Sequence, residues 1–158
     1  MSKSIKILNL FLVYFCITFQ LSAGNINVVD GDSLVVNGVM TRMYGIDAPE
    51  YKQTCLDENE QEYQCGNSSK EALQNMITDD TICSIKGHDK HNRILTVCYN
   101  GNIDINKEMV KKGFAVAYSR YSDDYIDQET KAKENKIGLW RGTFIQPEKY
   151  RIMNRNRF

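Results

Sequence analysis

The sequence predicts a single α+β domain. The candidate strands come in one group of three and one group of two, and predicted helices separate and follow these groups. The 158 residues are 42 % hydrophobic and 25 % charged, which is enough chain and enough apolar content for one proper core. No internal repeat, low-complexity tract or interdomain linker divides the chain, so we expect a single active site.

The first group of strands is predicted within residues 28–50. Two apolar runs flank Asp30-Gly31-Asp32, and an alternating run containing Arg42 follows. Asp-Gly between β-branched runs is a strong hairpin signal, because a type I′ turn takes positive φ at both central residues. The next segment, Ser68-Ser69-Lys70-Glu71, has the pattern of a capping box that opens a helix reaching about Ile77. The inner face of this helix is predicted to carry Ala72, Leu73 and Met76.

The second group of strands is a hairpin, and three shorter elements follow it. In order, these predicted elements are a hairpin of residues 81–86 and 93–99, a helix of 105–112, a strand of 115–118 and a helix from Ser122 to Lys136. Gly113 ends the first of these helices, because glycine tolerates the left-handed conformation after a helix, and the second ends near Gly138. The basic tail, residues 141–158, has little periodicity. We interpret it as a solvated end, with a nucleic-acid contact as the alternative.

Residues 1–23 have the composition of a secretory signal peptide. Lys3 and Lys6 precede an apolar stretch over residues 7–19, and Leu21-Ser22-Ala23 offers a cleavage point. A membrane anchor is the rival interpretation, but a span needs roughly 20 apolar residues and this stretch is shorter. We therefore expect a secreted or periplasmic protein of residues 24–158, without stable membrane association. Without those two lysines its formal net charge is −2, so nucleic-acid binding would need a local basic patch.

The cysteine count agrees with export. Cys16 leaves with the signal peptide, and four cysteines remain, an even number that permits three pairings. Zinc is the competing interpretation, but there is no Cys-x-x-Cys pair. The pattern favours Cys55–Cys65, which closes an acidic loop, and Cys83–Cys98, which joins two strands at matched distances from their turn.

Residues 28–50 also hold the residues with the most evident chemistry. Asp32, Asp47 and Glu50 lie at predicted strand ends, with Arg42 between them. Carboxylates at the ends of rigid strands suit a hard cation such as Ca²⁺, which takes oxygen ligands, and an arginine beside such a cation suits a phosphate. Each feature alone has an ordinary explanation as a turn or a solvated side chain. Their conjunction predicts phosphodiester chemistry.

Four runs of the sequence together resemble the staphylococcal nuclease, or thermonuclease-like, family. These runs are VVDGDSLVV, TRMYGIDAPE, DKHNR at residues 89–93, and MVKKGFAVAY. Their order and spacing match that family over nearly all of the chain after residue 24. The resemblance implies a five-stranded OB-fold Greek-key barrel with about three helices packed against it, and one Ca²⁺ ion. It also implies a monomer that acts on DNA and RNA.

The resemblance assigns roles residue by residue. Asp32 and Asp47 correspond to metal carboxylates, and the carbonyl of Ala48 to a third ligand. Glu50 corresponds to the residue that activates water. The remaining assignments are phosphate clamps at Arg42 and Arg93. Apart from the resemblance, we expect substrate contacts at Lys90, Tyr118 and Tyr121, because aromatic rings stack on bases of any sequence; a place in the core is the equal alternative for the two tyrosines. Hydrolysis with the 5′ oxygen as leaving group would give 3′-phosphate products.

The chain departs from the family pattern at three places. Ala48 replaces a threonine, which keeps the carbonyl but removes a hydroxyl, and Asn92 stands where the family usually has glycine. The loop after Glu50 is acidic, which predicts repulsion of long DNA. The alternative function is a non-catalytic OB-fold module that only binds nucleic acid, but such a module needs no clustered carboxylates.

Overall fold

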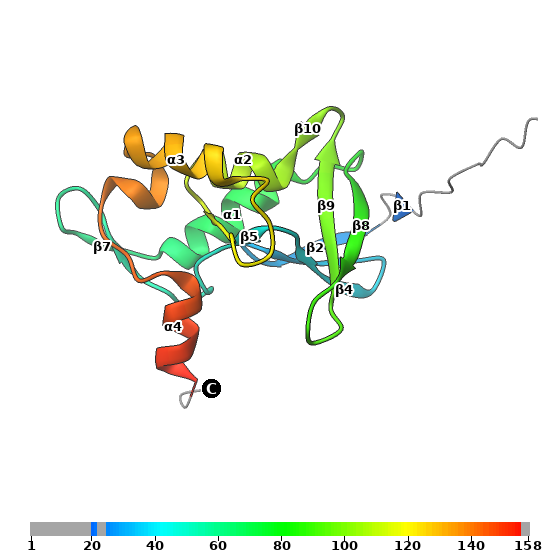
Figure 1. Ribbon diagram of the computed structural model, residues 1–158, viewed down its shortest axis with the longest axis horizontal. Coiled ribbons are helices and arrows are strands. Elements are labelled where there is room, and N and C mark those ends of the chain that lie inside the picture. Colours follow the sequence, from blue (N-terminus) through cyan, green and yellow to red (C-terminus); the bar gives the residue numbers. More distant parts are fainter. Residues whose placement is uncertain (1–19, 22–24, 156–158) are drawn as a thin grey trace, which may run out of the picture.

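The computed structural model describes residues 20–21 and 25–155 as an α+β domain, with helices packed on a mixed sheet (Figure 1). The predicted leader, residues 1–23, lies outside the described residues except for β1 (Gln20–Leu21), which pairs with β8. Within the described part of the chain, no helix is both long and apolar enough to cross a membrane.

The main path of the sheet runs β1-β8-β9-β4-β3-β2, and its five strands after β1 match the two predicted groups. They are β2 (Ile26–Asp30), β3 (Ser33–Val36), β4 (Val39–Met43), β8 (Ile82–His88) and β9 (Ile94–Asn100). Neighbouring strands are antiparallel except β4 and β9, whose parallel pairing joins the two groups. Thr41 lies opposite Ile94 and Arg42 opposite Leu95 in that pairing. It brings residues about fifty positions apart in sequence to one edge of the molecule.

Short strand pairs complete the sheet structure. These are β5 (Ile46–Asp47) with β11 (Val116–Ala117), β6 (Cys55–Leu56) with β7 (Glu62–Tyr63), and β10 (Ile103–Asp104) with β9. The β5–β11 pair matters most for the site, because Val116 lies opposite Asp47. The predicted strand of residues 115–118 is therefore confirmed, with its ladder limited to two residues.

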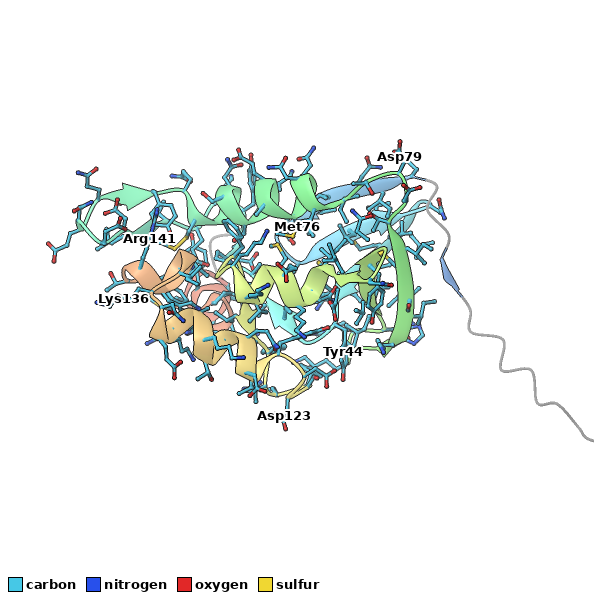
Figure 2. All side chains as sticks on the ribbon, turned by 90° about the horizontal axis from the view of Figure 1, so that it is seen from above. Tyr44, Met76, Asp79, Asp123, Lys136 and Arg141 are labelled. Carbon is cyan, nitrogen blue, oxygen red and sulfur yellow. A yellow bond between two sulfur atoms is a disulfide. The ribbon has the colours of Figure 1, made fainter. Side chains whose placement is uncertain are left out.

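Three helices form a layer on the sheet, and a fourth stands apart. They are α1 (Cys65–Met76), α2 (Ile105–Lys111), α3 (Ile126–Glu134) and α4 (Pro147–Asn154), with a 3₁₀ turn, η1 (Gly138–Arg141), before α4. Figure 2 shows α1, α2 and α3 side by side. Their buried side chains meet those of the strands in one core that includes Leu34, Met43, Leu73 and Met109. In Figure 1, α4 projects on the other side of the sheet.

Two predicted helix caps are wrong. Helix α1 begins at Cys65 rather than after Ser68, and the hydroxyl of Ser69 donates to the carbonyl of Phe114 at 2.5 Å. Ser122 accepts from the backbone N–H of Asp124 in the loop before α3. Ser68 and Ser122, the predicted caps, therefore bond locally without capping a helix, since the hydroxyl of Ser68, inside α1, donates to the carbonyl of Gln64. The predicted ends near Ile77 and at Gly113 are confirmed.

Both predicted disulfides are confirmed. Cys55 bonds to Cys65 and Cys83 to Cys98, with Cα separations of 5.6 and 4.0 Å. The second bond joins residues directly opposite each other on β8 and β9. The first ties β6 to the start of α1, which explains why this helix begins earlier than its capping pattern indicated.

Candidate active site

Two buried aspartates form the floor of the site. Asp32 lies in the turn between β2 and β3, and Asp47 ends β5; their exposed fractions are 3 % and 1 %. Asp32 is held by the backbone N–H of Ala48, which donates to Oδ2 at 2.9 Å, and by the hydroxyl of Ser33, which donates to Oδ1 at 3.0 Å. The carboxylates therefore have fixed positions before any ligand binds.

The turn that carries Asp32 is not the predicted type I′ turn. Neither Gly31 nor Asp32 has a positive φ. Gly31 is required for a different reason, because a Cβ there would lie 2.7 Å from the Cβ atoms of Ala48 and Ser69. The glycine lets the first turn pack directly against the segment that follows Asp47, and this brings the two aspartates together.

Arg42 bridges the two aspartates. Its Nη2 donates to Oδ2 of Asp32 at 2.8 Å and to Oδ1 of Asp47 at 2.5 Å. Burial by itself would lower the pKa of this guanidinium, but the two carboxylates outweigh burial and raise it. Arg42 is therefore a permanent cation, with little exposure, at the centre of the floor.

A third aspartate lies beside this group, and the sequence analysis did not single it out as a ligand. Asp30, in the same Asp-Gly-Asp motif, has its pKa raised to about 6 by burial and by the neighbouring charge of Asp32. Burial and Asp32 likewise raise the pKa of Asp47 to about 6, although Arg151 and Arg42 oppose the shift. At Asp47, burial and the charge of Asp32 therefore outweigh the opposing effect of both arginines on the pKa.

These residues fit a hard divalent cation. Among the described residues, no three His, Cys, Asp or Glu side chains are arranged as a ready-made cage. The two fixed carboxylates of Asp32 and Asp47, close to a backbone carbonyl at Ala48, nevertheless supply the oxygen donors that Ca²⁺ or Mg²⁺ takes, and water commonly completes such shells. A cation here would be held chiefly by Asp32 and Asp47.

Glu50 lies at the edge of the floor, in the turn after β5. Its Oε1 accepts from Nη1 of Arg151 at 2.8 Å, and its side chain is one-third exposed. The turn is fixed by fully buried Gln53, whose Oε1 accepts from the backbone N–H of Glu50 at 3.2 Å. Any side chain at Gly66 would collide with the Glu50 carbonyl oxygen, so the start of α1 packs closely against this turn.

A pocket of about 700 Å³ opens beside the floor; Arg42 lines it, whereas Asp32, Asp47 and Glu50 are not among its lining residues. In Figure 1 the tip of the β8–β9 hairpin and α4 project on the same side of the sheet, and both contribute to its wall. The loop from β11 to α3 contributes a third side. All five predicted phosphate-clamp and substrate-contact residues line it: Arg42, Lys90, Arg93, Tyr118 and Tyr121.

Arg93 reaches this pocket from the hairpin but does not bond to the floor. Its guanidinium pairs with Asp89 of the same turn, Nη2 to Oδ2 at 2.7 Å, and its side chain is well exposed. Asn92 beside it adopts a φ of 60°, the left-handed conformation expected where the family has glycine. Arg93 is therefore near the site, in a pair that solvent screens and a phosphate can replace.

The two tyrosines form one wall of the pocket rather than part of the core. The ring centroids of Tyr118 and Tyr121 are 5.0 Å apart, and the Tyr118 hydroxyl donates to Oε1 of Glu148 at 3.1 Å. Figure 2 labels Tyr44, whose hydroxyl donates to the carbonyl of Tyr121 at 3.5 Å and steadies the same loop. The acidic loop of residues 57–62, by contrast, does not line the pocket.

Arg151 is the residue that the sequence analysis missed. The prediction of a solvated tail is wrong for residues 147–154, which form α4. From this helix Arg151 donates through Nη2 to Oδ2 of Asp47 at 3.0 Å, and its Nη1 lies 2.9 Å from Oδ1 in an ion pair. Pro147 at the first helical position was the available signal for a helix, but eight residues give too little periodicity to show its inward face.

Buried carboxylates bridged by an arginine, beside a pocket with further arginines and paired aromatic rings, are side chains whose chemistry suits phosphate groups and nucleotide bases. The chain belongs to the family of staphylococcal nuclease homologues, whose family model matches residues 40–142. This membership confirms the predicted family and the OB-fold class.

Three relatives illustrate the range of the family. The chain is 34 % identical to the succinoglycan biosynthesis protein ExoI of Rhizobium meliloti (79 % of this chain, 66 % of that protein). It is 33 % identical to an uncharacterized endonuclease of Haemophilus influenzae (80 % and 70 %). It is 27 % identical to the probable staphylococcal-like nuclease CAN1 of Oryza sativa (80 % and 36 %). The chain thus spans just under two thirds of the first relative, and far less of the plant protein.

Proposed function

We propose that this protein is an exported, Ca²⁺-dependent endonuclease that hydrolyses DNA and RNA without sequence preference. The observation that carries the proposal is the Asp32–Arg42–Asp47 floor beside a pocket that Arg42 and Arg93 line. Phosphate contacts carry no base information, so this constellation needs no base-reading element. The names of the Haemophilus and rice relatives, which describe nucleases, support the same activity.

In the proposed reaction, Ca²⁺ held by Asp32, Asp47 and the Ala48 carbonyl would draw charge from the scissile phosphate. Arg42 and Arg93 donate hydrogen bonds to the phosphate oxygens as their negative charge grows. Glu50 takes a proton from the attacking water; only its Oε1 is bonded to Arg151, which leaves Oε2 for this role among the described contacts. The bond from phosphorus to the 5′ oxygen breaks, and the 3′-phosphate remains. Lys90, Tyr118 and Tyr121 bind the neighbouring nucleotides.

Two further features fit this function. The two disulfides are compatible with an oxidising compartment, so we place the protein outside the cytoplasm as a secreted or periplasmic monomer. The acidic loop of residues 57–62 lies off the pocket and pairs in part with Arg141 through Glu58. It therefore does not line the substrate path, and its charge acts on long DNA only at a distance.

The test is cleavage of single-stranded DNA and of RNA by refolded residues 24–158, first with Ca²⁺ and then with excess chelator. We expect products in Ca²⁺, less turnover in Mg²⁺ because of its stricter octahedral geometry, and none in chelator. An Asp47→Asn variant is the matched control for contaminating nuclease. Full activity in chelator would contradict the calcium requirement, and binding without cleavage would favour the alternative, a non-catalytic binding module.

A further inference from the structure

Arg151 and a cation compete for the same atoms. Oδ2 of Asp47 accepts from Arg151, and Oδ1 accepts from Arg42 while it lies 2.9 Å from Nη1 of Arg151 in an ion pair. A divalent ion that uses Asp47 must take at least one of these oxygens, so its arrival opposes the Arg151–Asp47 pair both by occupancy and by charge repulsion. The structure therefore shows the carboxylate in an arginine-bound state.

The Arg151 side chain lies beside open space in the pocket. It is one-third exposed and lines the pocket together with Arg42 and Arg93. A guanidinium released from Asp47 would face the space where a substrate phosphate would lie, and its planar fork suits two phosphate oxygens.

The helix that carries Arg151 is anchored independently of Asp47. The amide of Gln53 donates to the carbonyl of Ile145 at 2.6 Å, just before α4. One turn before Arg151, Glu148 accepts from the Tyr118 hydroxyl and pairs with Arg120 at 3.0 Å. The side chain can therefore change partners while α4 stays on the pocket wall.

We propose that Arg151 is a third phosphate-binding arginine of this site, one that occupies Asp47 and Glu50 until a cation loads and then turns to the substrate phosphate. This inference rests on the proposed function. It separates Arg151 from Arg42, which stays on the floor, and from Arg93, which pairs with Asp89 of its own turn. It also links cation loading to the release of Glu50 for its role toward water.

Removal of Arg151 should change the affinities for Ca²⁺ and for nucleic acid in opposite directions. In Arg151→Met the competitor is gone, so we expect Ca²⁺ to bind about tenfold more tightly without nucleic acid, as measured by calorimetry. With saturating Ca²⁺, a single-stranded oligodeoxythymidylate should bind about tenfold more weakly by fluorescence anisotropy, because a charge-assisted contact is lost. Cleavage is avoided by placing Glu50→Gln in every protein compared.

Two variants of the purified protein serve as controls. Lys149→Met removes the same charge from an exposed position of the same helix and should change neither affinity more than about twofold. Arg151→Lys keeps the charge without the fork, so Ca²⁺ affinity should stay near wild type while oligonucleotide affinity falls. Thermal unfolding checks that each variant is folded.

The measured affinities distinguish the proposed role of Arg151 from two alternative roles. Weaker Ca²⁺ binding in folded Arg151→Met would mean that Arg151 orders Asp47 for the cation, and unchanged affinities would make it a passive ion pair; either result overturns the proposal. If the wild-type protein cleaves in Ca²⁺ and the variants give either of these results, the proposed function stands and only the role proposed for Arg151 is overturned. A wild-type protein that binds no Ca²⁺ overturns both.

Discussion

The floor of the site and the rim of its pocket are built on different principles. The floor, Asp32, Arg42 and Asp47, comes from three neighbouring segments and is buried among hydrogen bonds. The rim is exposed and comes from the β8–β9 turn, the β11–α3 loop and α4. The rim residues are Lys90, Arg93, Tyr118, Tyr121 and Arg151. The buried charges of the floor must serve both folding and chemistry, whereas exposed rim charges such as those of Lys90 and Arg93 contribute less to folding.

Glu50 lies at the boundary between the two regions and tests whether chemistry can be removed without loss of binding. Glu50→Gln keeps the side chain's shape and its acceptor for Arg151 but removes the proton acceptor. We expect single-turnover cleavage to slow by two to about four orders of magnitude, the range for a lost general base, with oligonucleotide affinity nearly unchanged.

The matched control for this change is Glu62→Gln, an exposed position on β7 outside the pocket. It should cleave like wild type. Near-wild-type cleavage by Glu50→Gln at saturating substrate would exclude Glu50 as the base.

Arg42 tests whether the floor stabilises the fold. Arg42→Met leaves Asp32 and Asp47 buried without their shared cation, and removal of one partner from a buried pair costs about 3–5 kcal/mol. We expect the free energy of unfolding, measured by urea denaturation in chelator, to fall by about this amount. Arg93→Met, the same change in the rim, should cost no more than about 1 kcal/mol, because the guanidinium is exposed and Asp89 keeps its hydrogen bonds from the backbone N–H groups of His91 and Arg93. Equal losses would erase the distinction between floor and rim.

The two regions also differ in how far sequence could predict them. The floor residues lie within sixteen positions of one another, so strand ends and turn motifs brought them into one hypothesis. What local pattern could not show was why Gly31 is there: its role is close packing on Ala48 and Ser69, not a positive φ. Asp30 was not predicted as a ligand, because a turn is a sufficient explanation for an aspartate before a glycine.

The rim depends on contacts between distant segments. The parallel pairing of β4 with β9 places the Arg93 turn beside the floor, and no local periodicity encodes a partner strand. Arg93 was predicted only through the resemblance to a known family, and the sequence left open whether the tyrosines belong to the site or to the core. Arg151 bonds to a residue 104 positions away, from a two-turn helix in a tail without clear amphipathic pattern. The two wrong helix caps have a local cause instead, since Ser68, inside α1, bonds to Gln64 and Ser122 to Asp124 in the loop before α3.

The smallest expected effect belongs to Arg93→Lys, which tests the rim alone. If Arg93 is only a solvated residue, the change should be almost silent, since exposed conservative substitutions usually fall within about 0.5 kcal/mol. If it clamps phosphate, lysine keeps the charge but loses the two-pronged geometry. The loss should then appear mainly in kcat, because the crowded negative charge exists only in the transition state.

We expect kcat of Arg93→Lys to fall by about 100-fold, roughly 2.7 kcal/mol at 1.36 kcal/mol per decade, while Tm hardly moves. Lys90→Arg is the control in the same turn, since it keeps the charge of a residue assigned to binding rather than to the reacting phosphate, and any change should appear in KM. A kcat within a few-fold of wild type, for folded Arg93→Lys at saturating Ca²⁺, would remove Arg93 from the reaction. The Asp89–Arg93 pair would then only stabilise the hairpin turn. The arginines that act on phosphate would be Arg42 and Arg151, which both contact Asp47.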